Sequence, residues 1–202
     1  FLTEYAHPKV KRFVFPVLDI LASLPSVIYG VWGILVIVPI VSRITPAHYG
    51  FSAGYTVLAA SIVAAVMIFP MMVSLFIEIF ASVGADLRES SLAIGATRWQ
   101  TAIHVVIKKS LPGIFAATVL AISRAFGETI AVLMVCGNMA KTPHSIFDPC
   151  YPLPALLANN YGEMLSLPMY ESALMFSAFI LFIVIVIFNI ASRLILRSVS
   201  KK

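Results

Sequence analysis

The sequence predicts an all-α integral membrane protein, a polytopic helical bundle with four transmembrane helices in this chain. Hydrophobic residues make up 60% of the 202 residues and charged residues 11%, whereas a soluble domain carries about 25% charged residues. Four stretches are long and apolar enough to cross about 30 Å of hydrocarbon as helices. They run over about residues 13–41, 55–80, 111–137 and 173–191. We therefore expect a single membrane domain over 1–202.

The first three stretches are longer than the roughly 20 residues that a spanning helix needs, so tilts or kinks are expected. Pro25, Pro39 and Pro70 are the places where kinks are predicted. Ser110 and Pro112 predict the start of the third span, because a hydroxyl caps the helix and proline has no amide hydrogen to satisfy. Between the last two spans, apolar pieces predict one or two short helices around 153–160.

The basic residues predict the orientation. All but three of the 14 Lys and Arg residues fall in the head, the middle segment or the tail of the chain. By the positive-inside rule, both termini and residues 86–110 are cytoplasmic and residues 138–172 are external. The three exceptions are Arg43 and Lys141 on the opposite side and Arg124 within the third span. The net charge of +5 therefore reflects membrane topology, and no nucleic-acid partner is expected.

Two full charges lie within the third span. Arg124 and Glu128 are four residues apart, which puts them on one face of a continuous helix, together with small residues. Ionisable groups within a bilayer usually face a bundle interior or a water-filled path. The small residues on this face are Ala117, Ala121 and Ala131.

This pair has two interpretations. Arg124 suits an oxyanion because guanidinium offers a planar, permanently charged fork, and Glu128 would hold it in place. Alternatively, the pair is a buried ion pair that only locks helices together. The neighbouring Thr129 is a further pathway candidate, although a hydroxyl within a span often bonds its own backbone.

The first span carries a polar stripe. A lone buried carboxylate at Asp19 requires a partner or water, which makes it a pathway candidate; alternatively, it lies near the cytoplasmic interface and pairs with Lys11 or Arg12. The small residues along the stripe predict close helix packing. These are Ser23, Ser26, Gly30 and Gly33.

The chain lacks the patterns of an enzyme or a metal site. Cys136 and Cys150 form no CxxC pattern and the histidines form no HExxH pattern, so no metal site is indicated. A disulfide between the two cysteines is allowed, but two independent thiols are favoured. No phosphate-cradling GxxxxGK[ST] pattern occurs, so the chain itself is not expected to bind or hydrolyse ATP.

The segment at 86–105 predicts an amphipathic surface helix that leads into the third span. Its apolar residues recur at spacings of three and four: Leu92, Ala96, Trp99, Ile103 and Val106. Glu78, at the cytoplasmic end of the second span, is interpreted as solvated or as lying at the membrane interface.

The same segment carries a family resemblance. Residues 89–95 read ESSLAIG and resemble the cytoplasmic signature of ABC-importer permeases, in which Glu-Ala-Ala is followed by three residues and Gly. The stretches LASLPSVIYGVWG (21–33) and SRAFGETIAVLMVCGN (123–138) are similar to the PstC-type permease family of bacterial phosphate importers. The chain departs from the family in having Ser90-Ser91 for Ala-Ala and in placing Leu111-Pro112 late, which implies a shifted start of the third span.

The resemblance implies an ATP-driven importer in a bacterial cytoplasmic (inner) membrane. It implies a second homologous permease subunit, two copies of an ATPase that uses ATP and Mg²⁺, and a periplasmic or lipid-anchored phosphate-binding protein, with membrane lipid around the permease. It also implies two further spans upstream, about six in a complete subunit, so the chain is expected to be N-terminally incomplete. The residues implied to dock in the ATPase groove are Glu89, Ala93, Gly95, Ala96, Thr97 and Trp99.

The expected function is inward movement of inorganic phosphate without covalent chemistry. One alternative is a permease for another oxyanion, such as sulfate or molybdate. A second alternative is an ion-coupled carrier in which Glu128 and Asp19 relay protons. A carrier has no need of a helix that docks an ATPase, so dependence of uptake on ATP separates these classes.

Overall fold

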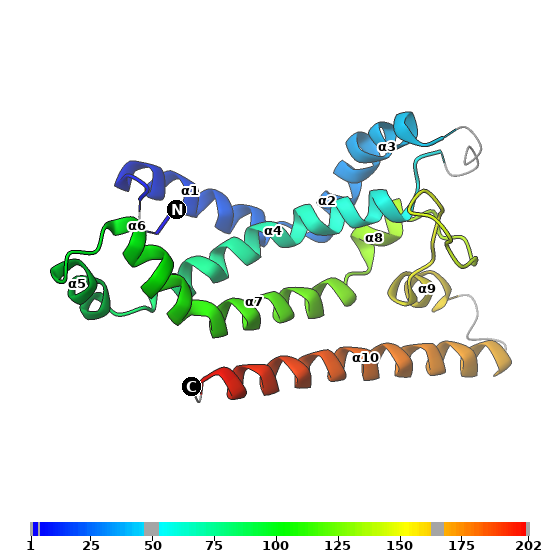
Figure 1. Cartoon of the computed structure of the whole chain (residues 1–202). Coiled ribbons are helices and arrows are strands. Elements are labelled where there is room, and N and C mark those ends of the chain that lie inside the picture. The colour runs from blue at the N-terminus through cyan, green and yellow to red at the C-terminus, as the bar shows by residue number, and fades with distance from the viewer. Residues whose placement is uncertain (1, 4, 47–52, 163–167, 201–202) are drawn as a thin grey trace. The chain divides into compact units, whose positions relative to one another are not determined.

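The computed structural model describes residues 2–3, 5–46, 53–162 and 168–200, without the side chains of 192 and 195–200. Within these ranges the regular structure is helical, apart from one isolated β-bridge between Gly137 and Cys150. The prediction of an all-α membrane protein is confirmed (Figure 1). Four helical stretches in the described part are long and apolar enough to cross a membrane: Ser26–Ile44, Val57–Ala81, Arg98–Phe126 and Pro168–Ala191.

The helices follow one another along the chain with short connections. The first half contains α1 (Pro8–Ser23), α2 (Ser26–Trp32), the π-helix η1 (Gly33–Ile37), α3 (Val38–Ile44), α4 (Val57–Ala81) and α5 (Ala85–Ala93). The second half contains α6 (Arg98–Gln100), the π-helix η3 (Thr101–Ile107), α7 (Lys108–Phe126), α8 (Ile130–Val135), α9 (Leu153–Asn160) and α10 (Pro168–Ser200). The short helix expected around 153–160 is therefore present as α9.

The chain forms two compact units. The first unit contains Phe1–Ser23, Phe69–Ser123 and Phe188–Lys202, and the second contains Leu24–Ile68 and Arg124–Ile187. Every Lys and Arg of the sequence belongs to the first unit except Arg43, Arg124 and Lys141. The head, middle segment and tail, which the charge distribution places on one side of the membrane, thus belong to the same unit.

The core of the second unit is built where α8 packs against α2 and η1. Val63, Ala131 and Val135 have no exposed surface there. A Cβ atom at Gly33 would lie 2.7 Å from Val63 Cγ2 and 2.9 Å from Val135 Cγ1. Because a side chain has no room at that position, the glycine end of the polar stripe is a packing surface.

The expected single helix over 13–41 is broken. Helix α1 ends at Ser23, and α2 begins at Ser26 after Pro25, whose φ of −58° and ψ of 139° are extended. Proline disfavours the helical conformation in the residue before it, which stops α1 at this point. The membrane-crossing helix starts at Ser26, so the boundaries of the first span move towards the C-terminus. Pro70 lies inside α4 without ending it, because neighbouring groups in a membrane helix can compensate for the hydrogen bond that proline removes.

The expected third span over 111–137 is also displaced. The helical stretch begins at Arg98 rather than at Ser110, and it ends at Phe126. Ser110 and Pro112 lie inside it, directly after the π-helix η3. Proline removes one backbone hydrogen bond from a helix. Turns of π-helix are often found where the regular hydrogen bonds of a helix are interrupted. The prediction of a helix start at Ser110 was therefore wrong.

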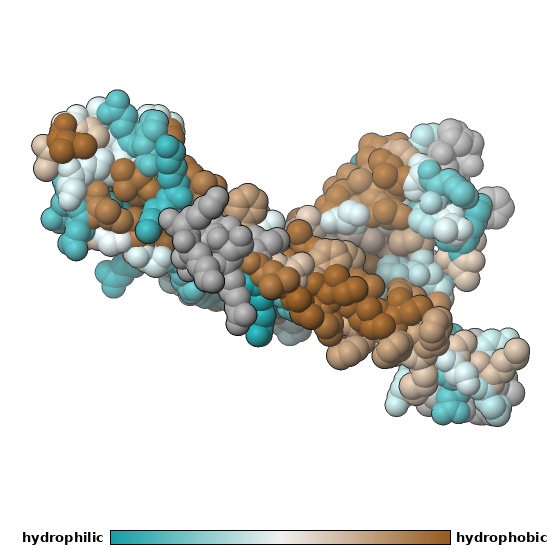
Figure 2. Space-filling view, turned by 60° about the horizontal axis from the view of Figure 1, so that its bottom comes forward, coloured by the Kyte–Doolittle hydropathy of each residue, from teal (hydrophilic) through white to brown (hydrophobic). Residues whose placement is uncertain are grey.

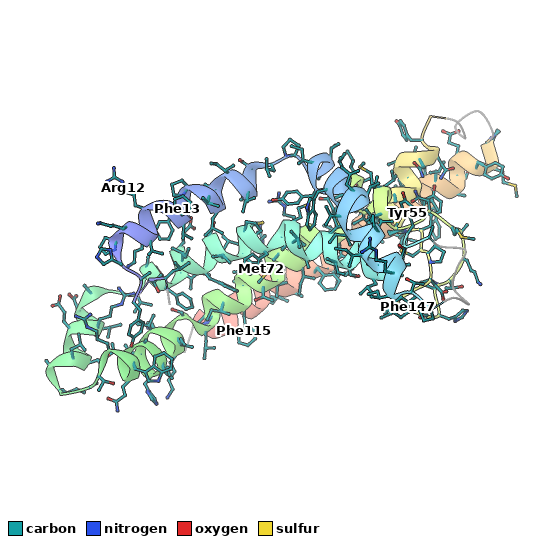
Figure 3. All side chains as sticks on the ribbon, turned by 90° about the horizontal axis from the view of Figure 1, so that it is seen from above. Arg12, Phe13, Tyr55, Met72, Phe115 and Phe147 are labelled. Carbon is teal, nitrogen blue, oxygen red and sulfur yellow. The ribbon has the colours of Figure 1, made fainter. Side chains whose placement is uncertain are left out.

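The helices expose a large hydrophobic surface, as expected for a protein surrounded by lipid or by other subunits. Figure 2 shows hydrophobic residues covering much of the surface along the helices, with hydrophilic residues gathered towards the helix ends. The side chain of Phe13 on α1 is 73% exposed and that of Phe115 on α7 is 54% exposed (Figure 3). Exposed large hydrophobic residues on several helices are typical of a surface that lipid or another subunit covers.

Candidate translocation and docking sites

The helix that was expected to carry both charges of the third span ends between them. Arg124 lies in the last turn of α7, which stops at Phe126, and Glu128 lies in the connection to α8. The Gly127 amide bonds to the Arg124 carbonyl at 3.1 Å, and the Glu128 amide bonds to the Ala125 carbonyl at 3.2 Å. These three-residue bonds tighten the last turn and finish the helix. The prediction that Arg124 and Glu128 lie on one face of a continuous helix is therefore wrong.

Glu128 has a defined structural contact at the start of α8. Its Oε1 atom accepts a hydrogen bond of 3.3 Å from the Ala131 amide. The first amides of a helix have no partner within the helix, and a negative charge near them is favourable. The Thr129 hydroxyl donates to the Gly127 carbonyl at 3.2 Å, so this side chain bonds its own backbone. Both residues thus shape the break between the helices.

Arg124 is exposed, whereas Ala121 one turn earlier and Ala117 two turns earlier on the same helix are 2% and 4% exposed. A cation in the last turn of a helix is stabilised by the helix dipole. The structure therefore presents the guanidinium at a helix end in the second unit and does not place it among the buried residues of the alanine stripe.

Asp19 belongs to the first unit, so it is described separately from Arg124. It is exposed on α1 and lines a hollow of about 180 Å³ together with Ser74 and Glu78. Glu78 is also exposed, which agrees with its interpretation as a solvated or interfacial residue. The four predicted pathway residues are therefore not assembled into one site within either unit.

The predicted docking segment is two helices joined by a sharp turn, and not one continuous amphipathic helix. Helix α5 ends at Ala93, and Gly95 follows with a φ of +91°. The Gly95 amide bonds to the Leu92 carbonyl at 3.0 Å, and the Ala96 amide bonds to the Ser91 carbonyl at 3.2 Å. This pair of bonds is the Schellman arrangement, which needs a left-handed residue directly after the helix. Gly95 provides that conformation.

The next helix starts immediately after the turn. The Thr97 hydroxyl accepts from the Gln100 amide at 3.2 Å, and the Gln100 side chain accepts from the Thr97 amide at 2.8 Å. This reciprocal capping box marks the true beginning of the third span. Because this signal is local, the Thr-Arg-Trp-Gln sequence alone could have revealed it.

Side chains hold the turn against the neighbouring helices. Ser91 is buried, and its hydroxyl lies 3.0 Å from that of Thr101 on η3. Arg88 donates to the Phe80 carbonyl at the end of α4, over 2.6 Å. The replacement of the family's alanine by Ser91 therefore does more than keep the residue small, because the hydroxyl joins α5 to the following helix.

The turn presents an exposed apolar tip. Ile94 is 86% exposed and Trp99 is 64% exposed, while the Trp99 ring packs at 6.2 Å from that of Tyr5. The sequence interpretation missed Ile94; an apolar residue directly before a turn glycine was the available signal. Of the predicted docking residues, Ala96 is half-buried and the other five are exposed: Glu89, Ala93, Gly95, Thr97 and Trp99.

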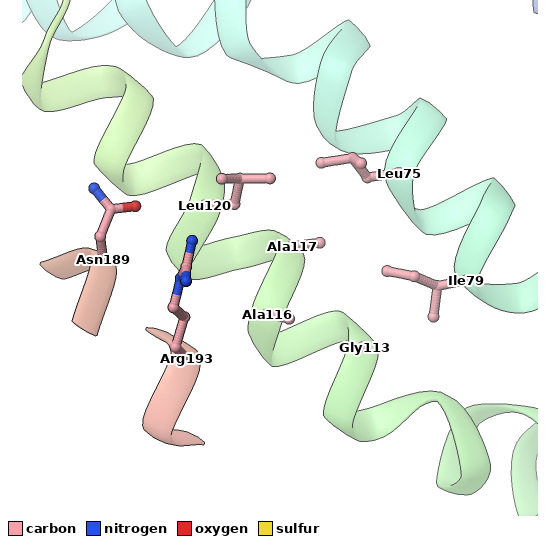
Figure 4. Close-up of a pocket in the computed structure, with 8 residues that line it drawn as sticks. All are labelled: Leu75, Ile79, Gly113, Ala116, Ala117, Leu120, Asn189 and Arg193. Atoms are coloured by element: carbon pink, nitrogen blue, oxygen red, sulfur yellow. The ribbon is translucent and has the colours of Figure 1, made fainter. Parts of the chain in front are cut away.

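The first unit also contains a groove of about 350 Å³ lined by α4, α7 and α10 (Figure 4). Only Asn189 and Arg193 bring polar groups to it; the remaining lining is Leu75, Ile79, Gly113, Ala116, Ala117 and Leu120. Such a surface suits a hydrocarbon chain or an apolar helix better than a small anion. Within the described part of the chain, no three His, Cys, Asp or Glu side chains are grouped as a metal site.

Comparison with known proteins identifies the family to which this chain belongs. Residues 1–202 match the family described as "Binding-protein-dependent transport system inner membrane component". The chain is 35% identical over 217 residues to the "Phosphate transport system permease protein PstC" of Xylella fastidiosa (strain 9a5c), covering 100% of this chain and 66% of that protein. The protein of the same description from Pasteurella multocida (strain Pm70) is 34% identical over 217 residues, with coverages of 100% and 67%.

A further relative is described in broader terms. The "Probable ABC transporter permease protein YqgH" of Bacillus subtilis (strain 168) is 39% identical over 163 residues, which cover 81% of this chain and 52% of the relative. The chain thus spans about two thirds or less of the length of these relatives. No solved structure matches it. The chain belongs to the family of inner membrane components of binding-protein-dependent transport systems, and is a multi-pass, non-catalytic permease component.

Proposed function

We propose that this chain is part of the permease of an ATP-driven importer that moves inorganic phosphate into the cell. The observation that carries the proposal is the likeness of the whole chain to proteins described as phosphate permeases. The assembly would contain a second homologous permease, two ATPase subunits that bind ATP and Mg²⁺, and an external phosphate-binding protein. ATP and Mg²⁺ thus act on the partner and not on this chain.

The turn between α5 and α6 is the proposed docking element for the ATPase. Its exposed Ile94 and Trp99 form an apolar contact that a complementary groove would bury, since aromatic and large aliphatic side chains dominate the energy of interfaces. The bonds from Ser91 and Arg88 make the turn rigid. A rigid turn transmits movement of the ATPase to the helix Arg98–Phe126, whose last turn carries Arg124.

The charge distribution supports a cytoplasmic location for the termini and for 86–110, with 138–172 external. We predict that a cysteine replacing Lys141 reacts with a membrane-impermeant maleimide in cells with a permeabilised outer barrier, whereas a cysteine replacing Arg98 does not. Both residues are exposed, so accessibility within the chain is matched. Both variants carry Cys136→Ser and Cys150→Ser to remove background labelling. Labelling at 98 and not at 141 would reverse the orientation.

Competition during uptake tests the proposed substrate. With the complete complex in proteoliposomes, labelled phosphate should enter only when ATP is supplied on the ATPase side. Unlabelled phosphate and arsenate should compete, because both carry a proton to donate at neutral pH, whereas sulfate does not. A site built to accept that hydrogen bond rejects an anion without it.

Two other outcomes would replace this proposal. Preferential uptake of sulfate or molybdate would identify a permease for another oxyanion. Uptake that needs a proton gradient and not ATP would identify an ion-coupled carrier. The shared hollow of Asp19 and Glu78 is the feature that a proton pathway would use, so neutralising Asp19 would then be expected to stop uptake.

A further inference from the structure

Two cysteines that are distant in the sequence meet at the end of α8. Cys136 is the C-terminal cap of that helix, and Cys150 lies in the connection to α9. The Cys150 amide donates to the Cys136 carbonyl at 2.9 Å, and the adjacent Gly137 forms a β-bridge with Cys150. The two segments therefore run side by side at the cysteines.

The backbone between them is built for this close approach. Gly137 has a φ of +85°, and a Cβ atom there would lie 2.8 Å from Pro149 Cβ and 3.0 Å from the Tyr55 carbonyl. Only glycine tolerates both the conformation and the contacts. Asn138, with a φ of 49°, donates to the Leu133 carbonyl at 2.9 Å. Together these residues turn the chain sharply out of α8.

The connection that carries Cys150 is held in place from its other side. The carbonyls of Asp148 and Ile146 accept hydrogen bonds of 2.9 Å from the Val57 and Leu58 amides at the start of α4. These amides have no partner within their own helix. The segment is thus attached to both α4 and α8, and Cys150 is confined next to Cys136.

The side chains meet as well. Cys136 is fully buried and Cys150 is half-buried, and the two thiols lie close enough to interact with each other. The Cys136 thiol also lies 3.1 Å from the Asn138 side-chain oxygen. Neighbouring cysteines on backbones that are already bridged need little rearrangement to form a bond. Both cysteines are free thiols in the structure, as the sequence interpretation favoured, but they are neighbours.

We propose that Cys136 and Cys150 form an intramolecular disulfide. The inference rests on the proposed orientation, which places the connection on the external side, where thiols are oxidised. The oxidant is a thiol–disulfide oxidoreductase of that compartment in its disulfide form. The thiolate of the more accessible Cys150 attacks the oxidant's disulfide and gives a mixed disulfide. The thiolate of Cys136 then attacks the Cys150 sulfur and releases the oxidant's second thiolate.

The reaction is balanced without another reactant. The two cysteines lose two electrons and two protons, and the oxidant becomes a dithiol. The product joins the end of α8 covalently to the external connection. Since α8 packs on the core of the second unit directly after the break at Glu128, the bond would hold the outer side of this unit together.

Sequential thiol labelling of the complete complex tests the bond. Membranes are denatured in N-ethylmaleimide to block free thiols, then reduced and treated with a maleimide-linked polymer. We expect two polymer tags on this chain, and none if reduction is omitted. Cys136→Ser and Cys150→Ser should each leave one thiol that is blocked before reduction, so neither variant should gain a tag. The unreduced chain should also be lighter by two hydrogens.

Blocking of both native thiols before reduction would overturn the proposal. The orientation experiment then identifies the cause. Labelling at 141 from outside would mean that the thiols are external but do not bond. Labelling at 98 would mean that they face the reducing side. A tag that appears on either single variant would show an intermolecular disulfide, which also contradicts the inference.

Discussion

Arg124→Gln is expected to lower ATP-driven phosphate uptake by about 10- to 100-fold in a complex that still assembles. A hydrogen bond to a charged group contributes about 1.5–3 kcal/mol, and each 1.36 kcal/mol is about tenfold in rate. Because Arg124 is exposed at the end of α7, its replacement removes no side chain from the buried core. Arg124→Lys keeps the charge but not the planar fork, so intermediate uptake is expected.

Arg43→Gln is the matched control. Arg43 is also exposed and also lies in the last turn of a helix, α3, so both variants lose a favourable cation at a helix end. Uptake and the yield of assembled complex are measured side by side. Equal uptake by the Arg124 and Arg43 variants would contradict a role of Arg124 in the pathway. Reduced yield for Arg124→Gln would point to a structural role instead.

Glu128 provides a second comparison. Glu128→Gln retains a side-chain oxygen that can accept from the Ala131 amide, whereas Glu128→Ala removes it. If the carboxylate acts only as a cap, Gln should be nearly neutral and Ala should destabilise the chain by about 0.5–2 kcal/mol. A change in phosphate uptake by Glu128→Gln would instead give the charge a role in transport. The double change Arg124→Glu with Glu128→Arg should not restore uptake, because the two positions share no helix.

Gly95→Ala is expected to weaken docking of the ATPase and to lower the coupling of ATP hydrolysis to transport. A left-handed conformation costs an L-residue about 1–2 kcal/mol, and this changes a two-state equilibrium by about 5- to 30-fold. A Cβ atom at Gly95 meets nothing within 4 Å, so the effect comes from the backbone. Gly95→Asn should be milder because asparagine tolerates this conformation. Gly95→Trp, which adds bulk to the docking surface, should abolish coupling.

Gly84→Ala is the control for this series. Its Cβ would also meet nothing within 4 Å, but Gly84 has a φ of −54°. Alanine fits there, and normal coupling is expected. Co-purification of the ATPase and the ratio of phosphate moved to ATP hydrolysed are measured for each variant. Normal coupling in Gly95→Trp would show that this turn is not the dock. Ile94→Ala tests the same surface without altering the turn, since that side chain is 86% exposed.

The sequence by itself determined the class of protein and the features that depend on neighbouring residues. Four long apolar stretches need internal hydrogen bonds in a membrane, so helices follow from composition alone. The clustering of basic residues predicted one side of the membrane, and these residues do share one unit. The helix at Leu153–Asn160 could also be predicted from the sequence, because residues next to it in the chain set its boundaries. The signature around Gly95 marked the docking segment, but the sequence predicted one amphipathic helix there and not the turn.

Only the tertiary structure decided where the helices stop. A spacing of four residues puts Arg124 and Glu128 on one face only if the helix continues, and α8 instead starts anew where Ala131 and Val135 pack on the core with no exposed surface. The meeting of Cys136 and Cys150 likewise depends on Gly137, Pro149 and the contacts with α4. The spacing of apolar residues along the sequence predicts each helix without reference to the helices that pack against it. A break or a contact between distant segments is selected by packing that pairs residues far apart in the chain.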